Sequence, residues 1–180
     1  TENMYVSITP LPLSTDPDFI ESVNTFALHP DMADLTLLQR DVATAVIDLS
    51  MQFADRGYQC DIELLSQVLG RLCDIQVRDF ALGTHNEKTF DNYWNMWLYL
   101  LRVAPVGFVA PVACLFATLA YERGDSELAY RALDRAAEDD PKYSLTILLR
   151  RVFGSGWPAA AFAAMRVELH PKVTAGIFDS

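Results

Sequence analysis

Residues Ala110 to Leu149 have the pattern of two helices joined by a tight turn, and this pattern constrains the fold more than any other part of the chain. Alanines are frequent in both halves of the stretch, and Gly124-Asp125 separates them. Glycine is favoured where a helix ends, and aspartate caps the start of the next one. The small side chains let two helix axes approach closely. The stretch therefore predicts a helical hairpin at 111–139, with helices at 111–123 and 126–139.

Two adjacent carboxylates, Asp139 and Asp140, end the second helix of this hairpin. Acidic side chains are unfavourable at a helix C-terminus, where the backbone dipole is negative. We therefore interpret Asp140 as the N-cap of a further helix with Pro141 at its first position, because these residue types favour those two places.

The rest of the chain predicts further helices and no convincing strand. The clearest helix lies between Asp34 and Ala54, where apolar residues recur at three- and four-residue steps. Caps and breakers predict other helices at residues 16–28, 61–72, 74–82, 87–103, 141–153 and 158–165. No second copy of the hairpin follows at a fixed spacing, so a repeat solenoid is not expected. The predicted fold class is all-α, a compact bundle of about seven to eight helices.

The 180 residues fit one domain with ordered or irregular ends. Prolines among serines and threonines predict an extended arm or linker over residues 1–18. The helical domain is expected to cover residues 19–165. Residues 166–180 are expected to form an irregular C-terminal tail.

The net charge of −10 comes entirely from the first half of the chain. Residues 1–100 hold five basic and fifteen acidic side chains, whereas residues 101–180 hold nine of each. An acidic surface repels phosphate groups, so nucleic acid and anionic membranes are excluded as expected partners. Two interpretations stay open, a basic partner and simple solubility.

The cysteines and the N-terminus predict a cytoplasmic protein. Cys60, Cys73 and Cys114 are odd in number and far apart, which favours reduced and mostly buried thiols. No signal peptide is visible. Residues 103–121 carry no charge and are long enough to suggest a membrane span. Prolines and a glycine interrupt the first half of that run, so we interpret it as a buried connection followed by a helix.

Two groups of residues are candidates for a site, and each has a structural interpretation beside the functional one. Arg78-Asp79 lies in a short apolar helix, where adjacent side chains point about 100° apart and must find different partners. The pair could form a polar site or an ion pair that ties the helix to its neighbours, and the second is preferred. Trp94 and Trp97 could form a ligand wall, but their spacing favours core packing.

No cofactor or metal is expected. His29, His85 and His170 are isolated in the sequence, and the first two are expected to be exposed loop residues. Metal sites need several converging ligands, and no Cys/His set is present. Nucleotide-binding glycine motifs and the serine-hydrolase motif are absent as well.

Two family resemblances follow from these residues. The hairpin resembles one tetratricopeptide unit, on the positions Ala113, Phe116, Ala117, Ala120, Ala129, Leu133, Ala136 and Pro141. The first-helix aromatics of that repeat are missing. Residues 64–158 more closely resemble the C-terminal region of an actinobacterial family with a domain of unknown function (number 4192). The blocks that carry this resemblance start at Asp74, Leu119, Ala132 and Asp140 and end at Gly156-Trp157-Pro158.

The family resemblance implies no activity, cofactor or catalytic residue. Family members usually carry a preceding α/β half, which this chain does not show, so a fragment or a short paralogue is implied. We expect an interaction or regulatory module without catalysis of its own. Its partner would be another protein or its own missing N-terminal domain, and a homodimer is an alternative. An accessory domain of an enzyme and a small-molecule-binding domain also stay open.

The expected partner site includes a groove beside the alanine-lined hairpin. The residues assigned to this site are Arg78, Asp79, Gly124, Asp125, Asp140 and Tyr143.

Overall fold

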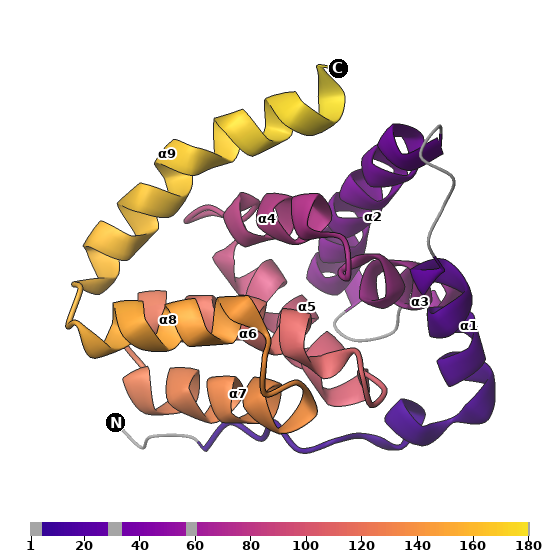
Figure 1. The fold of residues 1–180 in the computed structure, drawn as a ribbon, viewed down its shortest axis with the longest axis horizontal. Coiled ribbons are helices and arrows are strands. Elements are labelled where there is room, and N and C mark those ends of the chain that lie inside the picture. The colour runs from indigo at the N-terminus through magenta and orange to yellow at the C-terminus, as the bar shows by residue number, and fades with distance from the viewer. Residues whose placement is uncertain (1–4, 29–33, 57–60, 180) are drawn as a thin grey trace.

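The computed structural model describes residues 5–28, 34–56 and 61–179, and within them every regular element is a helix. The all-α prediction is confirmed, with nine α-helices in the described ranges against the seven to eight expected. A short 3-10 helix at Pro12–Thr15 precedes them. The α-helices are α1 (Pro17–Ala27), α2 (Leu35–Arg56), α3 (Ile62–Arg71), α4 (Ile75–Gly83), α5 (Phe90–Val103), α6 (Val109–Glu122), α7 (Ser126–Asp139), α8 (Ser144–Gly154) and α9 (Ala159–Phe178) (Figure 1).

The predicted hairpin is formed by α6, which lies in the core, and α7, which packs on it with one face exposed. Every residue of α6 from Val109 to Tyr121 is buried, and Ala129, Ala132 and Ala136 of α7 have no exposed surface. Gly124 adopts a φ of +88° in the turn, and Asp125 caps α7 by accepting a hydrogen bond from the Leu128 amide. The alanine faces are therefore packed in the core. The prediction of a docking groove beside the hairpin was wrong, because the alanine faces of α6 and α7 that would line the groove are buried.

The uncharged run at 103–121 is a connection followed by a core helix, as expected. Residues 104–108 form the turn between α5 and α6. No helix in the described part of the chain has both the length and the apolar character that a membrane span requires.

Residues 5–11 have no regular secondary structure, and they are fastened to the bundle. The extended arm predicted up to residue 18 ends earlier, because a 3-10 helix begins at Pro12 and α1 begins at Pro17. Arg131 of α7 donates to the Val6 carbonyl at 3.1 Å and stacks over Tyr5. Arg135 donates to the Ile8 carbonyl, and Arg102 of α5 donates to the Thr9 carbonyl at 2.9 Å. The arm lies along α7 before the chain enters α1 (Figure 1).

The expected irregular tail at 166–180 was wrong, because α9 continues to Phe178 with Pro171 inside it. The proline removes one backbone donor, yet contacts at the far end stabilise the helix. Ile177 is fully buried against Ala43 and Phe80. Arg40 of α2 donates to the carbonyl oxygens of Ile177 (3.0 Å) and Phe178 (3.4 Å), which satisfies orphan acceptors of the last turn.

The expectation that Asp140 caps a helix was also wrong. Asp140 follows α7 and accepts a hydrogen bond from the Lys142 amide in a turn, while α8 begins at Ser144 without a side-chain cap. The other carboxylate, Asp139, accepts hydrogen bonds from the amides of Gly107 (2.8 Å) and Val109 (3.1 Å). It thus satisfies donors at the start of α6, where a negative charge is favourable.

Candidate functional site

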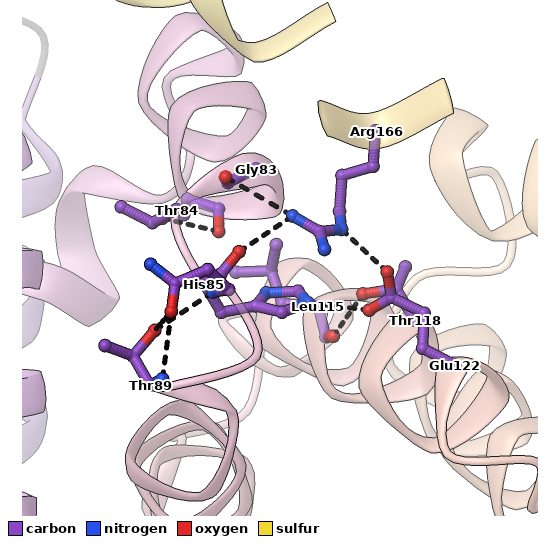
Figure 2. A network of polar contacts seen from close by, with 10 residues as sticks. Gly83, Thr84, His85, Thr89, Leu115, Thr118, Glu122 and Arg166 are labelled. Atoms are coloured by element: carbon purple, nitrogen blue, oxygen red, sulfur yellow. Dashed lines mark hydrogen bonds and ion pairs between the residues drawn. The ribbon is translucent and has the colours of Figure 1, made fainter. Parts of the chain in front are cut away.

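A buried polar network joins three separate parts of the fold. Glu122, at the end of α6, contacts His85 after α4 and Arg166 in α9, and all three side chains are buried (Figure 2). One oxygen of Glu122 lies 2.6 Å from His85 Nε2, and the other accepts from Arg166 Nε at 2.7 Å. Arg166 also donates to the carbonyls of His85 (3.0 Å) and Gly83 (3.4 Å). The network fixes α9 to α6 and to the end of α4.

The network stabilises a neutral His85. Burial lowers the pKa of His85, the positive charge of Arg166 lowers it further, and Glu122 opposes both. The other ring nitrogen, Nδ1, is buried without a hydrogen-bond partner. A protonated ring would leave a buried N–H unpaired, which costs about 1–3 kcal/mol. We therefore assign the tautomer in which Nε2–H donates to Glu122.

Glu122 remains ionised in this setting. Burial alone would raise its pKa, but the hydrogen bonds and charges of His85 and Arg166 outweigh burial and hold the pKa below its usual value. Both carboxylate oxygens are engaged within the protein. The network therefore holds no reactive group open to a substrate, and its role is to position α9.

Acidification from pH 7.5 to 5.5 is expected to lower the free energy of unfolding. The pKa values of His85 and His170 are both lowered by burial in the folded protein. In that window the unfolded chain binds more protons, so stability falls with pH, by at most about 1.4 kcal/mol per unit for each histidine. Urea denaturation of His85→Gln should show a shallower pH slope than the wild type. An unchanged slope in both His85→Gln and His170→Gln would contradict the assignment.

The position of His85 corrects the expectation of an exposed loop residue. His85 does lie in a loop, but only 3% of its surface is exposed, and its ring packs edge-on against Phe90. Its partner Glu122 is 37 residues away along the chain, and no local pattern joins the two. The sequence contains no signal that predicts this network. His170 lies on α9 and is half-buried beside Phe80, and His29 falls outside the described residues.

Three of the predicted site residues come together. Arg78 donates to Asp79 Oδ1 through Nε (3.1 Å) and Nη2 (2.9 Å), and its Nη1 donates to the Tyr143 hydroxyl at 3.3 Å. The expectation that Arg78 and Asp79 find different partners was wrong, because the long arginine side chain folds back along its own helix. The hydrogen bond from Arg78 to Tyr143 joins α4 to the start of α8. This agrees with the preferred interpretation, in which these residues tie their helix to its neighbours.

The other predicted site residues do not join this cluster as a single site. Asp140 is nearby in the turn, where its carbonyl accepts from the Tyr143 amide. Gly124 and Asp125 lie at the opposite end of α7, about 20 Å away at 1.5 Å per residue. The six predicted residues therefore fall into two groups, one near each end of α7.

The two tryptophans belong to the core, as their spacing predicts. Trp97 is 1% exposed, and Trp94 packs edge-on against Phe116 at 4.8 Å. Arg123 stacks over Trp94 at 4.4 Å and covers its outer side. Neither ring lines the cavity described below.

A cavity of about 490 Å³ does occur next to the network, between α2, α4, α5 and α9. Ile47, Ser50 and Met51 of α2 form one wall, and Phe80 and Thr84 at the end of α4 form the second. The other two walls come from the start of α5 and from α9, with the residues Thr89, Asn92, Tyr93, His170, Thr174 and Phe178. No sequence motif connects these positions, so the cavity cannot be predicted from the sequence.

The cysteines and carboxylates that the structure describes form no cluster of metal ligands. No group of three or more His, Cys, Asp or Glu side chains that could hold an ion occurs among the residues that the structure describes. Cys73 is exposed and Cys114 is buried. Burial raises the pKa of Cys114 to about 11 despite a hydrogen bond with Thr146, so this thiol is not a nucleophile at neutral pH.

Comparison with known families gives one match. Residues 21–160 match the family model described as Domain of unknown function (DUF4192). No curated protein and no solved structure matches the chain. The family match covers well over half of the chain and includes the region of the resemblance noted in the sequence. The chain therefore belongs to the family of proteins that carry the DUF4192 domain.

Proposed function

We propose that this chain is a helical protein-interaction module without catalytic activity of its own, and that it binds a basic, apolar protein segment on the exposed face of α2. The observation that carries the proposal is this face. Leu37 and Met51 are each 60% exposed, and Ile47 is 39% exposed. With Asp41 and Asp48, which are also exposed, these three residues define the α2 face.

The spacing of these residues places them on one side of the helix. Positions 37, 41, 44, 48 and 51 follow one another at three- and four-residue steps, and Ile47 lies beside them. A face of this length spans about 20 Å along the helix axis. It suits an amphipathic partner helix that lays its apolar side on Leu37, Ile47 and Met51.

Charge favours a basic partner over a second copy of the chain. The α2 face lies in the half of the chain that holds all the excess acidity. A two-fold symmetric dimer through this face would bring Asp41 and Asp48 close to their own copies, and like charges there are unfavourable. A basic segment gains from the same carboxylates, and this attraction weakens as the salt concentration rises. We therefore expect a monomer in light scattering.

Catalysis is not part of the proposal, because the two polar clusters described above are occupied by contacts within the protein. Glu122, His85 and Arg166 bind one another, and Arg78 binds Asp79 and Tyr143. A general acid or base must reach a substrate proton within hydrogen-bonding distance. These groups lie between helices and fasten them.

The test uses a helical peptide of about 15 residues, which spans the length of the α2 face, with leucines on one side and lysines on the other. We expect Leu37→Asp to weaken its binding about tenfold or more in a fluorescence titration, because it removes apolar contact and adds a like-charged neighbour to Asp41. Val106→Asp is the matched control, since Val106 is 91% exposed in the turn before α6. Equal losses in the two variants would disprove the assignment.

A second pair of variants tests the charges. Asp41→Asn with Asp48→Asn changes the net charge as much as Asp18→Asn with Glu21→Gln does on α1, where both residues are also exposed. The α2 pair should weaken peptide binding more than the α1 pair. Equal effects would show that only the overall charge matters. A lysate protein retained by the wild type and equally by Leu37→Asp would also count against this face.

A further inference from the structure

The cavity between α2, α4, α5 and α9 is lined entirely by uncharged side chains at neutral pH. None of its lining residues is Asp, Glu, Lys or Arg, and its two titratable groups are Tyr93 and His170. Burial raises the pKa of Tyr93 and lowers the pKa of His170, so both shifts favour the neutral forms. The cavity is open to solvent beside Met51, which is 60% exposed, but a charged group seated among its deeper side chains would lose hydration without a counter-charge, which is costly. The lining therefore selects for a neutral ligand.

Three hydroxyl groups of the lining use their protons on backbone carbonyls, and two of them, those of Ser50 and Thr84, also hydrogen-bond the Tyr93 hydroxyl. Ser50 donates to the Ile47 carbonyl, Thr84 to the carbonyls of Phe80 and Ala81, and Thr174 to the His170 carbonyl. A hydroxyl has one proton and two lone pairs, so each of these oxygens retains at least one lone pair after its proton is used. A matching ligand supplies O–H or N–H donors.

The apolar part of the lining includes several aromatic rings. Phe80 lies 5.3 Å from the His170 ring and 6.0 Å from the Phe178 ring, measured between centroids. These distances are typical of aromatic pairs that pack edge-on or tilted, and a further ring can join such a group. The volume of about 490 Å³ lies in the range of cavities that hold small molecules.

We propose that this cavity binds a neutral aromatic small molecule that carries a hydroxyl or N–H donor. The aromatic ring packs with Phe80 and Phe178, and the donor bonds to a hydroxyl oxygen of the lining. The ligand touches helices that are far apart in the sequence, so its binding stabilises the packing of α9 on α2 and α4. Ile47 and Met51 belong both to the cavity lining and to the α2 face, so this ligand and the partner helix would compete for these two side chains. The proposal rests on the cavity and needs no partner on the α2 face.

Four probes of similar size separate the features of this ligand. The compound p-cresol has a neutral ring with one hydroxyl, toluene lacks the hydroxyl, 4-hydroxybenzoate adds a negative charge and tyramine adds a positive one. We expect p-cresol to bind with a Kd of about 1 mM, a usual affinity for so small a molecule, and each of the others to bind about tenfold more weakly. Absence of saturation by p-cresol up to about 10 mM, or tighter binding of a charged analogue, would overturn the proposal.

A pair of matched variants locates the site. Thr174 and Thr25 each donate a hydroxyl hydrogen bond to the carbonyl four residues earlier, at 3.0 and 2.9 Å, but only Thr174 lines the cavity. Thr174→Phe should fill the cavity and weaken p-cresol binding at least tenfold, whereas Thr25→Phe should leave it unchanged. Thermal unfolding reports whether each variant is folded.

Methyl NMR gives a second measurement, and it uses the wild-type protein, so it does not depend on whether a variant folds. Saturating p-cresol should shift the methyl signals of Ile47 and Met51, which line the cavity, and leave that of Ile62 on α3 unchanged. Shifts confined to Ile62, or equal losses of binding in the two threonine variants, would place the ligand elsewhere. Leu37→Asp should not alter p-cresol binding, so failure of the partner proposal and failure of this one are distinguishable.

Discussion

Replacing Glu122 with glutamine is expected to lower the free energy of unfolding by about 3–5 kcal/mol, because it leaves the Arg166 charge buried without a counter-charge. The two side chains are only 5% and 6% exposed, and they meet at 2.7 Å. Glutamine has nearly the same shape as glutamate, so the change tests charge and hydrogen bonding rather than volume. Urea denaturation at pH 7 measures the loss.

The structure offers a control with the same distance and different burial. Arg150 and Asp134 also meet at 2.7 Å, but their side chains are 44% and 64% exposed. Exposed ion pairs contribute about 0–1 kcal/mol, so Asp134→Asn should change stability by no more than that. Similar losses in Glu122→Gln and Asp134→Asn would contradict the claim that burial makes the Glu122 network important.

A double substitution tests whether Glu122 and Arg166 stabilise the protein together or independently. Arg166→Met removes the charge that Glu122→Gln leaves unpaired. The double variant should therefore lose less stability than the sum of the two single losses, by about 0.5–3 kcal/mol. If the losses simply add, the two side chains do not act together, and α9 is held by its apolar contacts and by Arg40.

Most helices of this fold could be predicted because their signals are local. Asp16, Asp61 and Asp74 each accept hydrogen bonds from the first turn of the helix that follows, as the sequence predicts. The helix predicted at 126–139 has those bounds in the structure. A cap acts within three residues and an amphipathic pattern within a few turns, so one stretch of sequence contains all the information needed.

The missed features depend on contacts between distant residues. The second half of α9 contains Pro171 and lacks a clear polar side, and it is helical because Ile177 and Arg40 meet across the fold. Asp139 was interpreted only with respect to its own helix, whereas its carboxylate caps the start of α6, 30 residues earlier. Tertiary contacts of this kind override local preference.

The candidate site was predicted only in part for the same reason. Arg78 and Tyr143 lie 65 residues apart and do meet. Both were assigned to the predicted site, but no pattern in the sequence predicts their contact. The cavity cannot be recognised in the sequence, because the serines, threonines and aromatic residues that line it come from four helices and form no motif. Only the packing of α9 brings these positions together.

The close packing of α3 on α1 gives the second large effect. Gly70→Ala in α3 is expected to lower the free energy of unfolding by about 1–3 kcal/mol. A Cβ atom at this position would lie 2.6 Å from the Val23 carbonyl oxygen and 2.8 Å from Phe26 Cβ, both in α1. Alanine is favoured over glycine by about 1 kcal/mol inside a helix, so a net loss can come only from the contact with α1.

Gly154→Ala is the matched control for this prediction. Gly154 is the last residue of α8, and a Cβ atom there would meet nothing within 4 Å. That variant should be as stable as the wild type or more stable by up to about 1 kcal/mol, because alanine restricts the unfolded chain. If α1 packs directly on Gly70, urea denaturation should show a lower free energy of unfolding for Gly70→Ala and an equal or higher one for Gly154→Ala. If both variants were more stable than the wild type, the added methyl group at position 70 would not meet α1. That result would mean that α1 and α3 lie further apart than in this structure.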